Sequence, residues 1–247
     1  MRPRVAKALY LLPCSLPNCL IMQHVDFPDS GYHNTWYFYE DAPEGYPTIQ
    51  ALQKGAPIPD TVFEDIARVL AITIRYELLT PTYIRLDDTI EIPSNSLEEF
   101  MSALRKVLAK KRALSIFSIG GYGKVLLPDG ETGIQADLIT IEDVLFFDRD
   151  LNVSTAKSIW VPISIDHTHR FEWQLPLAKL NAGRLQSALK EIKQTLKISD
   201  ANPDETDPDN PFVIQDYKLY LHPDIIKHKK DLDIPDVDMS EFMPPTI

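Results

Sequence analysis

Apolar residues recur at the spacing of a helix face in three long stretches of the chain. Residues 61–79 repeat them at every third or fourth position, which predicts a helix with one buried side and Asp60 as its N-cap. A second helix is predicted to begin at a capping box, in which Ser96 and Glu99 bind each other's free backbone amides. Residues 181–198 form the third amphipathic stretch.

Other parts of the chain show the alternation or short apolar runs of β-strands. Residues 82–92 alternate around Asp87 and Asp88 and predict a hairpin with an acidic turn. In residues 113–175, glycine, aspartate or proline separates the runs at hairpin spacing, which favours an antiparallel meander. The expected strands there are 114–119, 124–127, 134–139, 144–147, 158–165 and 170–175. The sequence therefore predicts an α+β fold, with an antiparallel strand-rich sheet packed against about three main helices and an acidic C-terminal extension.

Composition divides the chain into a globular body and an acidic end. Residues 202–211 contain no apolar side chain to repay the entropy of ordering, which indicates a linker. The tetrapeptides 102–105 and 187–190 are alike, so two similar strand–helix halves are an alternative organisation of the body. The expected bounds are 1–198 for the globular α+β domain (halves about 1–112 and 113–198), 199–211 for the acidic linker, and 212–247 for a C-terminal strand plus acidic–apolar tail.

The negative charge is concentrated after the body. The formal net charge is -11 at pH 7, and twelve acids against four lysines place -8 of it after residue 198. Such a surface repels nucleic-acid phosphates, so no nucleic-acid ligand is expected. The basic run from Arg105 to Arg112 is interpreted as a helix terminus. No apolar run reaches the length that a membrane span requires.

The N-terminal residues bear on localisation. Residues 1–22 combine a basic start with an apolar stretch, as a signal peptide does, but Pro13 and Pro17 interrupt it. Cys14 and Cys19 do not form a disulfide scaffold for a chain of this length. We therefore expect a cytoplasmic protein, and a processed signal over residues 1–22 is the alternative.

One short stretch has the form of a metal site. Residues 144–152 read Val-Leu-Phe-Phe-Asp-Arg-Asp-Leu-Asn, an apolar strand that ends in Asp148 and Asp150. This arrangement resembles the first motif of haloacid-dehalogenase-like phosphatases and the metal site of many glycosyltransferases. The resemblance implies that the two carboxylates hold magnesium or manganese against a phosphate group. A turn between two strands is the alternative, because aspartate and asparagine are common turn residues.

Two other motifs have competing interpretations. His167 and His169 would project to the same side of a strand and are weak candidates for metal ligands, or else they belong to a polar hairpin turn. Residues 118–124 are glycine-rich like a phosphate-binding loop, but the pattern after them is that of a strand and not of a helix. A glycine-rich hairpin turn is therefore predicted. No cofactor is expected.

Candidate partner-binding residues come from two places. The first is an aromatic cluster early in the chain, which could equally serve the core, and the second is the tail, where acids alternate with apolar residues. The candidates are Trp36, Tyr37, Tyr39, Asp233, Asp236, Asp238, Glu241 and Phe242.

The absence of a catalytic constellation favours a non-enzymatic protein-binding protein. The sequence pI of about 5.0 suggests a basic partner, as for an inhibitor or immunity-like partner of a bacterial toxin. The alternatives are a metal-dependent enzyme acting on a phosphorylated or sugar substrate through Asp148 and Asp150, and a scaffold or assembly subunit. The sequence does not indicate the oligomeric state.

Overall fold

The computed structural model of the chain describes residues 23–27, 29–39, 48–110, 117–142, 151–165, 171–198, 200–203, 210–227, 235 and 237–245. These ranges hold a large sheet and five α-helices, three of them long, which confirms the predicted α+β class.

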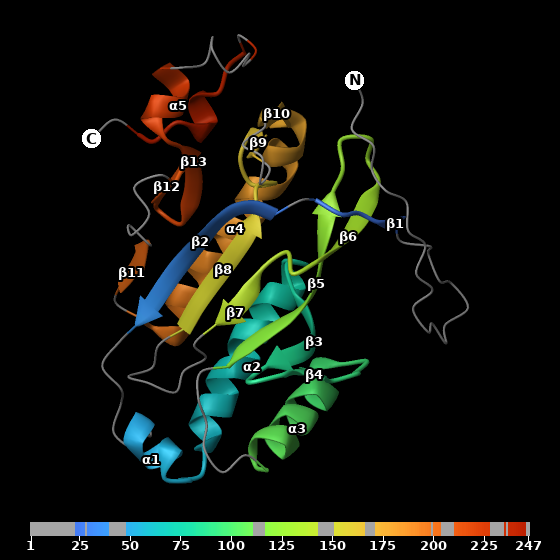
Figure 1. The fold of residues 1–247 in the computed structure, drawn as a ribbon, viewed down its shortest axis with the longest axis vertical. Helices are drawn as coiled ribbons and strands as arrows, with labels where there is room; N and C mark the ends of the chain where they lie inside the picture. Colours follow the sequence, from blue (N-terminus) through green and yellow to red (C-terminus); the bar gives the residue numbers. More distant parts are fainter. Residues whose placement is uncertain are drawn as a thin grey trace.

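Within the described ranges, the centre of the fold is a nine-stranded sheet (Figure 1). Its strands are β1 (Gln23–His24), β2 (Asp29–Tyr39), β3 (Thr80–Arg85), β4 (Thr89–Glu91), β5 (Ser118–Leu126), β6 (Thr132–Ala136), β7 (Thr140–Glu142), β8 (Leu151–Lys157) and β11 (Asp200–Pro203). Seven of them follow the order β1-β6-β5-β7-β8-β2-β11, while β3 pairs with β5 and with β4. The pairs are antiparallel, as predicted, apart from the short parallel pair of β1 and β6.

The described residues form five α-helices, of which the three long ones pack against the sheet. They are α1 (Ile49–Gln53), α2 (Asp60–Arg75), α3 (Leu97–Leu108), α4 (Leu175–Leu196) and α5 (Pro223–Lys227), with a 3₁₀ helix η1 (Ser240–Phe242) near the C-terminus. In Figure 1, α2 and α4 lie behind the sheet, and none of the described helices lies across the front. Two small hairpins complete the fold: β9 (Ile163–Ile165) with β10 (Phe171–Trp173), and β12 (Phe212–Gln215) with β13 (Lys218–Leu221).

The main core fills the space between the sheet and the helices behind it. Trp36 and Phe38 of β2 and Val153 of β8 belong to this core, as do Leu70 of α2 and Leu189 of α4. Each of the five is at most 1% exposed. Their removal from water is the main favourable contribution to folding.

Two of the helices begin at hydrogen-bonded side-chain caps. The Thr48 hydroxyl accepts a hydrogen bond from the Ala51 amide at 3.2 Å and begins α1. The Ser96 hydroxyl accepts one from the Glu99 amide and begins α3, as predicted. The Glu99 carboxylate accepts one from the Asn95 amide, one residue before the predicted Ser96 amide, so the reciprocal half of the capping box differs from the prediction.

The two longest helices differ from their predicted bounds. Asp60 is the first residue of α2 and not its N-cap; Pro59 occupies that position and makes no side-chain cap. The helix ends at Arg75, because Glu77 adopts a positive φ and the chain then turns into β3. Helix α4 begins earlier than predicted, directly after Gln174. The Gln174 side chain donates hydrogen bonds to the carbonyl oxygens of Ser158 and Val161.

The glycine-rich stretch is part of a strand, so the predicted hairpin turn is wrong. Gly120, Gly121 and Gly123 all lie within β5. A Cβ atom on Gly121 would lie 2.0 Å from the carbonyl oxygen of Thr80, and one on Gly123 would lie 2.3 Å from that of Leu78. Glycine is needed here because the backbone between α2 and β3 passes so close to β5.

Strand β8 begins at Leu151, inside the stretch for which the sequence offers a turn as the alternative. Leu151 and Asn152 already belong to the strand, and both are buried. The strand was missed because it carries polar residues that pair inside the sheet, such as Ser154 and Thr155. The strand predicted over residues 158–165 is shortened to β9.

After α4 the chain returns to the sheet for one short strand. The segment expected to be a linker begins with β11, where Ala201 lies opposite Phe38. The single strand predicted after it is a hairpin, whose turn residues Asp216 and Tyr217 both have positive φ. Strands from the two proposed halves pair with each other, β2 with β8 and β3 with β5. The division into domains at residue 198 stays a prediction.

Arg184 connects α4 to the centre of the fold. Its guanidinium donates hydrogen bonds to the carbonyl oxygens of Tyr76, Glu77 and Lys124, and to the side chain of Asn181. Burial lowers the pKa of Arg184 below its usual value. The bonds compensate for this desolvation and connect the end of α2, strand β5 and helix α4.

The close approach at β5 gives a test by substitution. We expect Gly121→Ala to lower the free energy of unfolding by about 1–3 kcal/mol, because the new methyl group meets a backbone oxygen that cannot move away. Gly183→Ala is the matched control, since Gly183 lies in α4 and its new methyl group would meet nothing within 4 Å outside its own helix backbone; it should gain up to about 1 kcal/mol. Urea denaturation measures both, and equal effects would contradict this account of β5.

Candidate functional site

The described part of the acidic tail packs on its own chain. Phe242 is fully buried and contacts Ala178 and Ala182 of α4, with Leu175 beside them. Met239 is 7% exposed and belongs to the main core. The segment over residues 237–245 therefore packs on the body through Met239 and Phe242.

Lys218 of β13 reinforces this attachment. Its ammonium nitrogen lies 4.9 Å from the centre of the Phe242 ring and donates a 2.7 Å hydrogen bond to the carbonyl oxygen of Glu241. It also forms an ion pair with the Glu241 carboxylate at 3.6 Å. One cation thus contacts the ring, the backbone and the side chain of the segment.

The two described acids of the tail, Asp238 and Glu241, are both exposed. Asp238 is exposed, and its carboxylate accepts a 2.9 Å hydrogen bond from the Ser240 amide. The hydrogen bonds from Ser240 hold the pKa of Asp238 below its usual value. The Glu241 side chain is 56% exposed, and the neighbouring Val237 is 43% exposed. Asp233 and Asp236, the other two acids proposed for binding, lie outside the described residues.

The aromatic candidates are divided between two faces of β2. Trp36 is 1% exposed and faces the core, so it is not available to a partner in this fold; the alternation of a strand is the reason. Its indole nitrogen has no hydrogen-bond partner among the described residues. Tyr37 lies on the opposite face and is partly buried, with Asn152 as its cross-strand neighbour. Tyr39 belongs to β2, and its backbone pairs with Asp200 of β11, but its side chain is not described.

Phe242 is likewise absent from the surface. The sequence grouped it with the acids as a binding residue, but its ring is 0% exposed. Its role in this structure is to anchor the segment that carries Asp238 and Glu241.

The front face of the sheet carries a chain of hydroxyl and carboxylate groups. Ser154 shares a 3.0 Å hydrogen bond with Thr35 and donates one to Glu142 at 3.1 Å. Thr140 donates to the other oxygen of Glu142 at 3.0 Å. A nucleophilic serine needs a general base held by a third group. Here the Glu142 carboxylate instead accepts one hydrogen bond from Thr140 of its own strand, β7, and one from Ser154 of β8. These hydrogen bonds therefore stabilise the pairing of β7 with β8.

A second polar cluster lies on the same face at β3. The Tyr83 hydroxyl donates a 2.6 Å hydrogen bond to Asp137, and the Tyr83 ring lies over Gly120. Arg85 lies beside the ring, 5.7 Å from its centre. Burial and then the hydrogen bond to Asp137 raise the pKa of Tyr83 well above its usual value.

The proposed metal sites are not tested by this structure. Asp148, Asp150, His167 and His169 all lie outside the described residues. Within the described part of the chain, no group of three or more histidine, cysteine, aspartate or glutamate side chains is placed to hold a metal ion.

No protein-family model, curated protein or solved structure matches this chain. In the ranges that the structure describes, no helix combines the length and apolar character needed to cross a membrane.

The anchoring role of Phe242 predicts a clear effect of its removal. We expect Phe242→Ala to lower the free energy of unfolding by about 3 kcal/mol and to speed amide exchange across η1, because a fully buried ring is lost. Val237→Ala, in the same segment but 43% exposed, should change stability by less than about 0.5 kcal/mol. Urea denaturation and hydrogen exchange measure the two variants, and a Phe242 variant as stable as the control would contradict the packing described.

The raised pKa of Tyr83 predicts a pH dependence. At pH 7 we expect Tyr83→Phe to lower the free energy of unfolding by about 1 kcal/mol, because Asp137 loses its donor. The folded pKa lies above the unfolded value, so this stabilisation is complete below pH ~10 and is lost as pH rises through the folded pKa. The difference between the two proteins should therefore shrink in strong alkali, and a difference that stays constant would contradict this reasoning. Denaturation curves from pH 7 upward decide the matter.

Proposed function

We propose that this chain is a non-enzymatic protein-binding protein, an inhibitor or immunity-like partner of a basic protein such as a bacterial toxin. We further propose that it acts in the cytoplasm. The observation that carries the proposal is the anchored acidic segment: Phe242 and Met239 are buried, while Asp238 and Glu241 stay exposed.

Charge supports a basic partner. Residues 231–247 carry five acids and no lysine or arginine, in a chain with a net charge of -11. A concentrated negative patch attracts a positive surface and speeds its encounter. Lys218 offsets part of this charge through Glu241, whereas the Asp238 carboxylate is exposed and accepts a hydrogen bond from the Ser240 amide.

Anchoring supports recognition as well as attraction. A mobile acidic tail must lose conformational freedom when it binds, which weakens the complex. The hydrogen bond from the Ser240 amide to Asp238 and the buried Phe242 ring already hold this segment in one arrangement. Val237 adds exposed apolar area beside the acids. A preorganised patch of this kind binds with less ordering of its own backbone.

The test is kinetic and uses matched pairs of charges. A partner is first captured with the intact chain from a lysate of the source organism and is then purified. We expect the double variant Asp238→Asn/Glu241→Gln to slow association several-fold and to reduce its dependence on salt, because two interface charges are lost. Asparagine keeps a side-chain oxygen that can accept the hydrogen bond from the Ser240 amide, so the segment should stay folded.

The control removes two equal charges elsewhere. Asp87→Asn/Asp88→Asn changes the turn between β3 and β4, and association should stay close to that of the unmodified chain. Stopped-flow or surface-based binding measures both variants. Equal slowing by the two pairs would show that only net charge matters, and no slowing by the tail variant would exclude this segment as the contact.

A further inference from the structure

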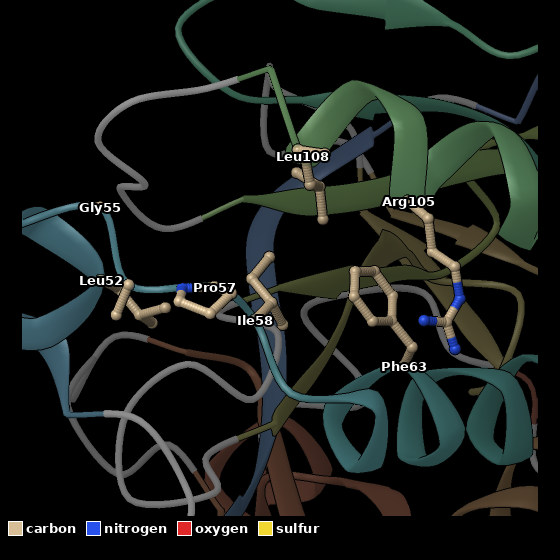
Figure 2. A pocket seen from close by; sticks show the side chains of 9 residues that line it. Leu52, Gly55, Pro57, Ile58, Phe63, Arg105 and Leu108 are labelled. Carbon is tan, nitrogen blue, oxygen red and sulfur yellow. The ribbon is translucent and has the colours of Figure 1, made fainter.

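A groove of about 390 Å³ lies between the end of α1, the start of α2 and the end of α3. In the view of Figure 2, side chains run from Leu52 and Pro57 at one end, past Ile58 and Phe63, to Arg105 at the other. Apart from Arg105 at one end, the side chains that line the groove are apolar. Its volume falls within the range of about 300–1,000 Å³ that small-molecule sites occupy.

The apolar part of the groove is firmly supported. Leu52, Phe63 and Leu108 are at most 5% exposed, so they are set by the packing of the three helices. Ile58 belongs to the partly buried side chains packed against the same core. A hydrocarbon ligand would meet surfaces that are already in place.

Arg105 is held where it can receive an anion. Its guanidinium carbon lies 4.2 Å from the centre of the Phe63 ring, which positions the charged group over the aromatic face. It forms an ion pair with Asp60, whose side chain is 81% exposed. Such exposed pairs contribute little to stability, so another carboxylate can replace Asp60 readily.

The start of α2 adds to the positive potential at this end. Pro59 is the N-cap of this 16-residue helix and provides no side-chain hydrogen bond to its first amides. Those amides carry the positive end of the helix dipole, next to Asp60 and hence to Arg105. The uncapped helix and the guanidinium together favour a negative group.

We propose that this groove binds a small amphipathic carboxylic acid. The apolar part of the ligand lies along Ile58, Phe63 and Leu108, and its carboxylate binds Arg105 in place of Asp60. A bidentate contact with the planar guanidinium would fix its orientation. This site is independent of the acidic segment and of the protein partner proposed for it.

Octanoate and 1-octanol are suitable probes, because they share a hydrocarbon chain and differ in charge. NMR titration of the full chain should show octanoate shifting the amides around Leu52, Ile58, Phe63 and Leu108. We expect Arg105→Gln to weaken octanoate binding at least tenfold, because a charge-assisted contact is lost, and to leave 1-octanol binding unchanged. Lys106→Gln, the same change at a neighbouring exposed position that does not line the groove, should have no effect.

The Asp60→Asn variant shows whether Asp60 competes with the ligand for Arg105 or only positions Arg105. If Asp60 competes with the ligand for Arg105, this variant binds octanoate several-fold more tightly than the unmodified chain. Weaker binding would mean that Asp60 only positions Arg105, and the displacement step would be wrong. An unchanged octanoate affinity in the Arg105 variant, or shifts that map elsewhere on the chain, would overturn the site itself.

Discussion

The partly buried guanidinium of Arg184 links helix α4 to the end of α2 and to strand β5. It donates to carbonyl oxygens at the end of α2 and in β5, while its own backbone belongs to α4. Carbonyls at the end of a helix carry partial negative charge and remain unpaired within the helix, so they are effective acceptors for a cation. Asn181 of α4 exchanges hydrogen bonds with the backbone of Leu126 close by. These contacts fix both the position and the rotation of α4 against β5.

The fixed rotation of α4 in turn places the C-terminal part of the chain. Ala178 and Ala182 contact Phe242, while Gln186 and Lys190 bind Asp216 in the β12–β13 turn. These four positions of α4 are spaced four residues apart and therefore form one stripe along the helix. Arg184 lies off this stripe and faces the sheet side. The acidic segment consequently owes its position to a helix whose other contacts lie in the main core.

Local features of the fold could be predicted from the sequence, whereas features that depend on distant residues could not. The caps at Thr48 and Ser96 involve neighbours within a few positions, so their signals are visible in the sequence. The strand through Gly121 was not visible, because the oxygen that excludes a side chain belongs to Thr80, forty-one residues earlier. Strand β8 was missed for a similar reason: its hydroxyl groups find their partners on other strands.

The same distinction applies to the candidate sites. Alternation along β2 is a signal that adjacent aromatic residues face opposite ways, so Trp36 and Tyr37 could not both have served one surface. The acidic–apolar alternation of the tail indicated two faces. Ala178 and Ala182 of α4, which pack against Phe242, lie some sixty residues earlier, and nothing in the sequence marked them as its contacts. The groove arises from three helices that only the fold brings together.

The net charge of the chain does not determine which ion either proposed site attracts; the charges close to each site do. In Figure 1 the groove helices α1 and α3 lie at one end of the molecule, and η1 follows α5 at the other end, beside the C-terminus. Screening limits the field of an exposed charge to about 8 Å at physiological ionic strength. An anion at Arg105 therefore responds to Asp60 and the start of α2 far more than to the distant acids of the tail. A chain with a net charge of -11 can for this reason hold an anion at one end while its other end attracts a cationic surface.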